Sequence, residues 1–234
     1  MIKEQLKRTS VRNYLDKKIE KSKINKIKQV INSAPTAKNF QCFSAIFITN
    51  QKTKKKLSEI NWNQKHITQA PLVILFCADN NRLDMSIPDK KDHSFEEYVW
   101  STIDATIAAT MAMDCVNELG LGCCFLGGIR FQADKIKQSL NLSGSITPVL
   151  GLCVGYPAKI NPIRPKINKV YDEKYSLSKV KAEMKEYDKV MNKYYLNTFK
   201  KDTTFKKINA ASIDKFDSKK NKEILKDQFK LKTI

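Results

Sequence analysis

The chain has 234 residues, of which 41% are hydrophobic and 29% are charged, a balance typical of a folded protein and not of a disordered one. No apolar run reaches the ~18–20 residues needed to cross a bilayer. Asp104 and Asp114 interrupt the longest candidate, 103–116. The N-terminus opens Met-Ile-Lys-Glu and lacks the apolar region of a signal peptide. We therefore expect a soluble cytoplasmic protein with no membrane partner.

The net charge is +19, from 43 Lys and Arg against 24 Asp and Glu. These charges are spread along the chain and interleaved with acidic residues, and no arginine-rich arm is present. This distribution favours a solvated surface, or a field that attracts small anions, over a nucleic-acid partner. A non-catalytic basic protein that binds nucleic acid remains the alternative hypothesis, and it predicts a duplex affinity that falls steeply with salt.

The six cysteines lie mostly inside apolar stretches, and no two of them form a Cys-x-x-Cys pair. Only His66 and His93 could join them at a metal, and neither has zinc-site spacing from a cysteine pair. We expect buried reduced thiols and no metal site.

The hydrophobic patterns predict alternating helices and strands. In chain order they are a helix from 22 to 33, a loop over 36–41, a strand over 43–49, a helix over 51–60, a strand over 71–78, a helix over 96–119, strands over 123–126 and 147–154 that flank a helix over 134–140, an extended arm over 158–168, a helix over 180–199 and a helical tail. The run 71–78 is apolar throughout, which is typical of a strand buried on both faces.

The helix over 96–119 is the longest of these elements. Its apolar side chains recur nearly every fourth residue, and Gly120 and Gly122 end it. Strands alternate with helices along the chain. We therefore predict an α/β or α+β fold in which a mixed central sheet is flanked by helices, with this long helix at its centre.

Three short motifs are candidates for ligand binding. Arg8-x-Ser10-x-Arg12 places two guanidinium groups and a hydroxyl close together, as a phosphate cradle requires. Gly127-Gly128 directly follows a predicted buried strand, where the absence of side chains lets a flat ligand approach the backbone. Arg164-Pro165-Lys166 holds two cations on a rigid arm. Taken singly, the three motifs are better explained as a basic surface, a tight turn and a solvated linker.

Taken together and in order, these motifs resemble one family. The matching segments are Lys7 to Tyr14, Ala34 to Gln41, Gln64 to Ile67, Phe76 to Asp79, Leu119 to Arg130, Pro148 to Pro157 and Arg164 to Lys166. The series resembles the nitroreductase family, in its branch of NADPH-dependent oxygen-insensitive nitroreductases and flavin reductases. The resemblance covers roughly residues 3–175, so we expect a core over 1–175 and a C-terminal helical extension over 176–234.

The resemblance implies a nitroreductase-like fold, an intertwined homodimer and two FMN molecules at the interface. The residues implied to hold the FMN phosphate are Arg8, Ser10, Arg164 and Lys166, with Thr9 beside them. Those implied around the isoalloxazine are Arg12 near N1 and O2, the backbone N–H groups of Gly127 and Gly128 at N5 and O4, Phe125 and Leu126 beside the ring, Gln64 at the pyrimidine edge, Asn39 and Gln41 from the partner subunit, and Lys38 as a further cofactor-binding residue.

The implied activity is that of an FMN-dependent NAD(P)H oxidoreductase. NADPH or NADH would give a hydride to FMN N5 and leave, and a nitroaromatic, a quinone or free flavin would then take the electrons at the same face. No catalytic side chain is needed, although Arg12 would tune the flavin. Arg130, Lys200 and Lys201 are candidates for substrate or NADPH contacts. Another flavin chemistry on the same fold, such as flavin fragmentation or reductive dehalogenation, is a further alternative.

Overall fold

The computed structural model describes residues 2–87, 89 and 93–216. The part of the predicted tail beyond residue 216 lies outside the described residues. The chain divides into two compact units, one that ends at Asn161 and one that begins at Pro162. Each unit is described by itself, and the expected boundary at 175/176 stays a prediction.

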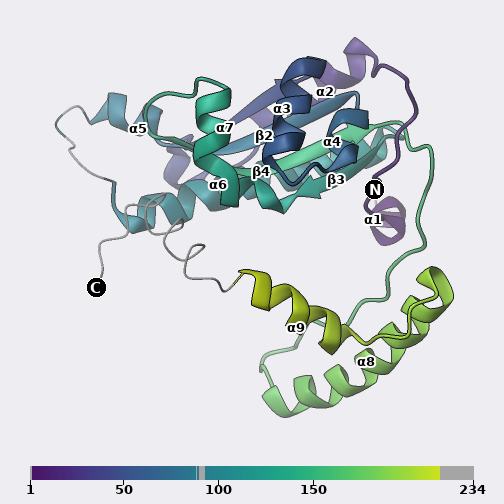
Figure 1. Ribbon diagram of the computed structural model, residues 1–234. Coiled ribbons are helices and arrows are strands. Elements are labelled where there is room, and N and C mark those ends of the chain that lie inside the picture. Colours follow the sequence, from purple (N-terminus) through teal and green to yellow (C-terminus); the bar gives the residue numbers. More distant parts are fainter. Residues whose placement is uncertain (1, 88, 90–92, 217–234) are drawn as a thin grey trace. The chain divides into compact units, whose positions relative to one another are not determined.

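The first unit contains four strands and most of the helices (Figure 1). The strands are β1 (Phe43–Ile48), β2 (Leu72–Asp79), β3 (Gly122–Leu126) and β4 (Ile146–Gly155). The helices are α1 (Ile2–Lys7), α2 (Lys21–Asn32), α3 (Gln51–Ile60), α4 (Lys65–Gln69), α5 (Asn81–Ser86), α6 (Phe95–Glu118) and α7 (Ala133–Ser139), with short 3-10 turns η1 (Ala37–Asn39) and η2 (Gly127–Gln132).

The four strands form one sheet in the order β1-β2-β4-β3, and all three pairings are antiparallel. The predicted mixed sheet is therefore wrong for the described residues. The strand–helix–strand order from β2 through α6 to β3 does make these two strands run in the same direction. They do not become parallel neighbours, however, because β4 inserts between them and pairs with both.

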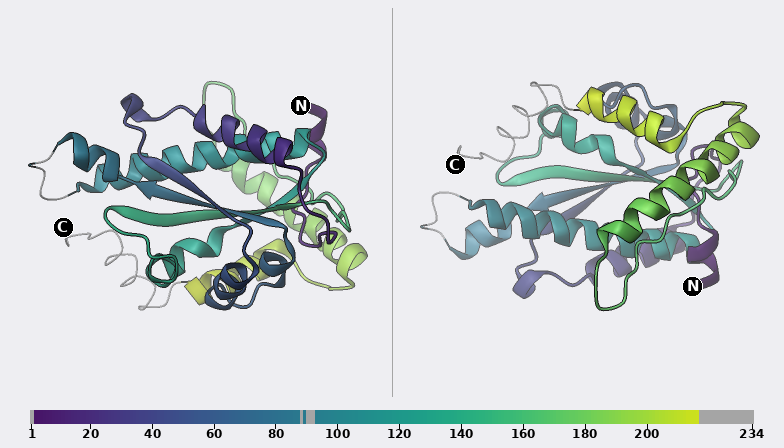
Figure 2. Two further views of the ribbon diagram at one scale, coloured as in Figure 1. Left: turned by 90° about the horizontal axis from the view of Figure 1, so that it is seen from above. Right: turned by 90° about the horizontal axis from the view of Figure 1, so that it is seen from below.

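Alternate residues of β2 pack into two separate hydrophobic cores, one on each face of the sheet, since successive side chains of a strand point to opposite faces. Leu72, Ile74 and Phe76 face α2 and α6, whereas Val73 and Leu75 face α3, α4 and α7. The views in Figure 2 show these two helical layers on either side of the sheet. All eight residues of β2 are buried, as the apolar run predicts.

Small side chains account for the close packing of α6, and the N-terminal ends of α3 and α2 differ in their capping. Ala105, Ala108, Ala109 and Ala112 are completely buried, and their small size lets α6 pack closely on α2 and the sheet. The side chain of Asn50 accepts a hydrogen bond from the Thr53 N–H and so caps the N-terminus of α3. The helix expected from Ser22 instead begins at Lys21, and Glu20 precedes it without a side-chain cap.

The second unit consists of an extended arm and the helices α8 (Leu177–Phe199) and α9 (Phe205–Phe216). The arm has no helix or strand, as Pro162 and Pro165 predict. It is held against α8, because the Tyr187 hydroxyl donates a 2.9 Å hydrogen bond to the Pro165 carbonyl oxygen and the Tyr194 hydroxyl donates one of 3.4 Å to that of Pro162.

The cysteines are free thiols, and all but Cys115 are buried. Within the described ranges, no group of three or more His, Cys, Asp or Glu side chains is arranged to hold a metal ion. None of the helices described combines the length and the apolar character needed to span a membrane.

Candidate functional site

The segment that carries Arg8, Ser10 and Arg12 is fixed to the open edge of β3. The Val11 N–H donates a hydrogen bond to the Cys123 carbonyl oxygen at 2.9 Å. The Val11 side chain is buried and fills the space that a side chain at Gly122 would need. The hydroxyl of buried Tyr14 then donates to the carbonyl oxygens of Val11 at 2.7 Å and Cys153 at 3.2 Å. The backbone between the two arginines is therefore held at one place on the sheet.

The polar groups of this segment lie near Cys124, the central residue of β3. Burial raises the pKa of the Cys124 thiol, while Arg12, a hydrogen bond with Ser10 and Arg8 act in the opposite direction. All three predicted phosphate-cradle side chains of the first unit are thus close enough to act electrostatically on one sulfur atom. Thr9 lies between them and is half-buried.

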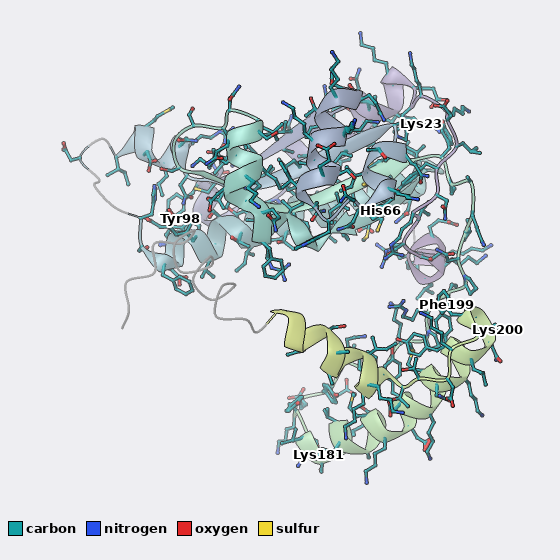
Figure 3. The ribbon with its side chains drawn as sticks, in the orientation of Figure 1. Lys23, His66, Tyr98, Lys181, Phe199 and Lys200 are labelled. Atoms are coloured by element: carbon teal, nitrogen blue, oxygen red, sulfur yellow. The ribbon has the colours of Figure 1, made fainter. Side chains whose placement is uncertain are left out.

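His66 lies near the same cluster. It lies on α4 and is half-buried (Figure 3). Its pKa is lowered first by burial and then by the positive charge of Arg12, so the imidazole and the guanidinium are neighbours. The sequence held only a weak indication of this contact, namely the spacing Gln64-Lys65-His66 within the family resemblance.

The two glycines at the end of β3 differ in their surroundings. A methyl group at Gly127 would meet only Arg130 Nη1, at an ordinary 3.5 Å. A methyl group at Gly128 would overlap the Trp62 ring and lie 2.5 Å from Asn61 Oδ1. Gly128 is therefore required by its neighbours within the chain, whereas the space at Gly127 is open to a ligand.

Arg130 closes the turn that begins with these glycines. Its Nη1 donates a 2.7 Å hydrogen bond to the Gly127 carbonyl oxygen, and its guanidinium lies 4.4 Å from the centre of the Phe131 ring. These contacts give Arg130 a role in holding η2. Its predicted contact with substrate or NADPH stays a prediction.

Three further predicted residues flank the turn. Leu126 is 1% exposed and packs in the core, so its side chain does not face a ligand. Phe125 is half-buried. Gln64 is also half-buried, and within the described part of the chain its side-chain amide makes no hydrogen bond, which leaves both its donor and its acceptor available.

The loop that carries Lys38, Asn39 and Gln41 has an unusual backbone. All three residues have left-handed φ angles, of 46°, 59° and 58°. Such angles are costly for residues other than glycine and persist only where surrounding contacts enforce them. Here the buried Asp104 on α6 accepts a 3.0 Å hydrogen bond from the Ala37 N–H. Gln41 Nε2 also donates to Asn39 Oδ1.

Arg82 anchors the other end of this loop. Its Nη1 donates to the carbonyl oxygens of Phe43 at 3.1 Å and Gln41 at 3.4 Å. It also forms an ion pair with buried Asp79 at 3.4 Å. The exposed side chains of Lys38, Asn39 and Gln41 are thus presented by a loop that is tied down on both sides.

This loop and the arginine segment lie at opposite ends of the sheet. Val11 is hydrogen-bonded to Cys123 on β3, and Cys123 is in register with Val154 on β4. Val154 is in turn in register with Leu72, at the start of β2. The loop enters β1 at Phe43, which is in register with Ala78 at the other end of β2. Six residues of strand separate these two levels, or roughly 20 Å. One chain therefore does not bring the two predicted groups together.

The remaining predicted cations belong to the second unit. Arg164 and Lys166 are exposed on the arm. Lys200 ends α8 in a left-handed conformation, with φ 55°, and Lys201 follows it (Figure 3). All four are accessible to a solvent-borne anion, but their convergence with Arg8 and Ser10 on one phosphate stays a prediction.

The donors of the first unit fit a planar ligand that carries a phosphate. Two guanidinium groups and a hydroxyl suit the phosphate. The open backbone at Gly127 and the free amide of Gln64 suit the edge of a heteroaromatic ring, since both can exchange hydrogen bonds with its heteroatoms.

Comparison with known proteins identifies the family of the chain. Residues 6–156 match the model of the nitroreductase family. The chain is 29% identical over 201 residues to "FMN reductase (NADPH)" of Bacillus subtilis (strain 168), covering 81% of each chain. It is 28% identical over 190 residues to "Oxygen-insensitive NADPH nitroreductase" of Salmonella typhimurium, covering 80% of this chain and 79% of the relative.

Solved structures of similar proteins have the same fold. The structure of NfrA2 from B. megaterium superposes with a TM-score of 0.89 at 28% identity, over 97% of this chain and 96% of that one. The fold is the α+β fold of these structures. This chain belongs to the nitroreductase family, which confirms the resemblance inferred from its sequence.

Proposed function

We propose that this protein is an FMN-dependent NAD(P)H oxidoreductase that reduces nitroaromatics, quinones or free flavin in a ping-pong cycle. The observation that carries the proposal is the attachment of the Arg8-x-Ser10-x-Arg12 segment, through the hydrogen bond from Val11 to Cys123, to the strand that ends at the open Gly127. The printed names of the relatives, an FMN reductase and an NADPH nitroreductase, support the same cofactors.

Bound FMN would supply the chemistry, by accepting a hydride from NAD(P)H and passing electrons to the acceptor. In our proposal Arg8 and Ser10 bind the phosphate, together with Arg164 and Lys166. Arg12 offers a fixed positive charge where reduction adds negative charge, and such preorganised charge lowers the barrier to hydride transfer.

The neighbours of Arg12 keep this charge fixed. Depression of the His66 pKa leaves that imidazole neutral at pH 7, so it does not add a second cation beside the guanidinium. Val11 and Tyr14 hold the backbone on either side of Arg12. Within the described residues the structure shows no ion pair between Arg12 and an acidic side chain that would cancel its charge.

We further propose an intertwined homodimer in which the loop of one subunit completes the site of the other. The separation of roughly 20 Å along the sheet between the levels of Val11 and Phe43 supports this arrangement, since a partner is needed to bring Arg12 and Gln41 to one flavin. The exposed apolar side chains along α6 also support it. Phe95, Ile103 and Ile107 are 58%, 51% and 36% exposed and recur at helical spacing. The cytoplasmic location and the division at 175/176 remain parts of this proposal.

Spectroscopy of the purified protein tests the cofactor. We expect a yellow protein with the absorbance of bound flavin, which NADPH bleaches under anaerobic conditions and a quinone restores. A colourless protein that takes up no FMN on saturation, and instead binds duplex DNA with a steep salt dependence, would favour the nucleic-acid alternative. Product analysis after turnover separates flavin fragmentation or dehalogenation from simple reduction.

Subunit mixing tests the shared site. Arg12→Ala and Gln41→Ala homodimers should each be weakly active, because every site lacks one residue. Heterodimers made by co-expression carry both lesions in one site and none in the other. Recovery of about half the wild-type activity per dimer supports the proposal, and no recovery contradicts it.

A further inference from the structure

The short connection between α3 and α4 has a strained backbone at a bulky residue. Trp62 and Asn63 both have left-handed φ angles, of 55° and 54°. For a large side chain this conformation costs about 1–3 kcal/mol and calls for an explanation. The Asn63 N–H donates to the Ser58 carbonyl oxygen at 2.8 Å, and the Ser58 hydroxyl donates to that of Gln64 at 3.0 Å. The strain is therefore maintained by the contacts on both sides of it.

The Trp62 indole lies beside the glycine turn. One edge of it occupies the space that a side chain at Gly128 would need. The ring also meets Phe131 edge to face, with centroids 6.5 Å apart and planes inclined at 61°. These contacts fix the orientation of the indole next to Gly127 and Gly128.

Trp62 nevertheless remains 55% exposed. A tryptophan that served only to cover Gly128 would bury most of its surface, because burial is what stabilises a large apolar side chain. Beneath it, the Asn61 side chain is completely buried, and neither its oxygen nor its nitrogen has a hydrogen-bond partner among the described residues. The connection thus combines a strained backbone, an unsatisfied amide and an exposed aromatic face, and none of these helps the chain to fold.

We propose that Trp62 determines acceptor specificity by stacking its exposed face on a planar aromatic acceptor. This proposal rests on the proposed function and adds a residue to the same site. A flat quinone or nitroaromatic presents a π face that an indole binds, whereas an inorganic oxidant such as ferricyanide presents none. The position beside Gly127 puts this face at the turn where the flavin is expected.

Trp62→Gly is the central variant, because glycine accepts the φ of 55° without strain and keeps the turn intact. We expect KM for a naphthoquinone and for a nitrobenzoate to rise about five- to tenfold relative to KM for ferricyanide, since aromatic stacking contributes about 1–1.5 kcal/mol. Trp62→Phe keeps an aromatic face and should restore most of the selectivity. An unchanged ratio of the two KM values, or equal losses with both kinds of acceptor, would show that Trp62 only supports the turn.

Fluorescence gives a readout that does not depend on turnover. The chain has two tryptophans, Trp62 and Trp100, so Trp100→Phe leaves Trp62 as the single indole. We expect that titration of this holoenzyme with a naphthoquinone, without NADPH, quenches the Trp62 emission along a saturating curve. The concentration at half-maximal quenching should be close to KM for that quinone. In the matched Trp62→Phe protein, which keeps Trp100, only linear collisional quenching is expected. Linear quenching in both proteins would overturn the proposal.

The two proposals fail in different ways. A protein that binds FMN and oxidises NADPH, but shows no selectivity change in the Trp62 variants, retains the proposed function and loses only the role of Trp62. A protein that takes up no FMN overturns both.

Discussion

The 2.9 Å hydrogen bond from the Val11 N–H to the Cys123 carbonyl oxygen joins the N-terminal segment to β3. It lies between Arg8 and Arg12, so it sets the place of both guanidinium groups relative to the strand that ends at Gly127. Since Gly122 has no side chain, Val11 packs directly on this strand. A contact between residues more than a hundred positions apart thus builds the candidate site.

Removal of the Arg12 charge should weaken flavin binding. Hydrogen bonds to charged groups contribute about 1.5–3 kcal/mol, so Arg12→Ala should raise the Kd for FMN about 10- to 100-fold and slow reduction by NADPH. Lys18→Ala removes one positive charge from an exposed site nearby and is the control. Flavin fluorescence titration and stopped-flow absorbance measure the two effects. If Arg12→Ala and Lys18→Ala behave alike, the role given to Arg12 is wrong.

The two glycines should respond differently to a single methyl group. Gly127→Ala meets only Arg130 Nη1 at 3.5 Å, so its melting temperature should stay near that of the wild type while its Kd for FMN rises at least tenfold. Gly128→Ala overlaps Trp62 and Asn61, and should lower the free energy of unfolding by about 1–3 kcal/mol. Calorimetry of the apoprotein and flavin titration separate these outcomes. Normal FMN affinity in Gly127→Ala would place the flavin elsewhere.

His66 should make the folded protein less stable in mild acid. Its folded-state pKa is lowered from 6.5 by burial and by Arg12, so the unfolded chain takes up a proton below pH 6.5 that the folded chain refuses. Stability from this group is complete above pH 6.5 and falls as the pH drops towards the folded-state pKa. Urea unfolding between pH 8 and 5 measures it. His66→Gln should flatten the profile, and Arg12→Ala should reduce its slope in part; a wild-type slope in His66→Gln would contradict this assignment.

Asp104 should hold the loop that carries Asn39 and Gln41. Its Oδ1 accepts the Ala37 N–H at 3.0 Å, in a place where the residue is 2% exposed. Asp104→Ala leaves that N–H without an acceptor and should cost about 1–3 kcal/mol of unfolding free energy. Trypsin should then cleave faster after Lys38. Asp104→Asn keeps an acceptor of the same shape and should resist cleavage, and equal cleavage of the two variants would show that the loop is held by other contacts.

Much of the local structure was predictable from the sequence, because it depends on near neighbours. The apolar run at 71–78 gave the buried strand β2, and the four-residue spacing of apolar residues gave α6. The short helices α1, α4 and α5 were missed, since a single helical turn has too few residues to show a period. The ligand motifs at Arg8–Arg12 and Gly127–Gly128 were also visible, because each lies within a few residues of chain.

Only the tertiary structure decided how these pieces meet. The antiparallel sheet follows from the insertion of β4 between β2 and β3, and no local pattern encodes that strand order. The closeness of His66 to the charge of Arg12, the separation of Val11 and Phe43 along the sheet, and the placement of Trp62 against Gly128 depend on the same strand order. The sequence by itself determined which residues can bind a phosphate and a flat ring. Packing between distant segments determined which of them one chain brings together, because side-chain contacts across a sheet depend on register and not on sequence spacing.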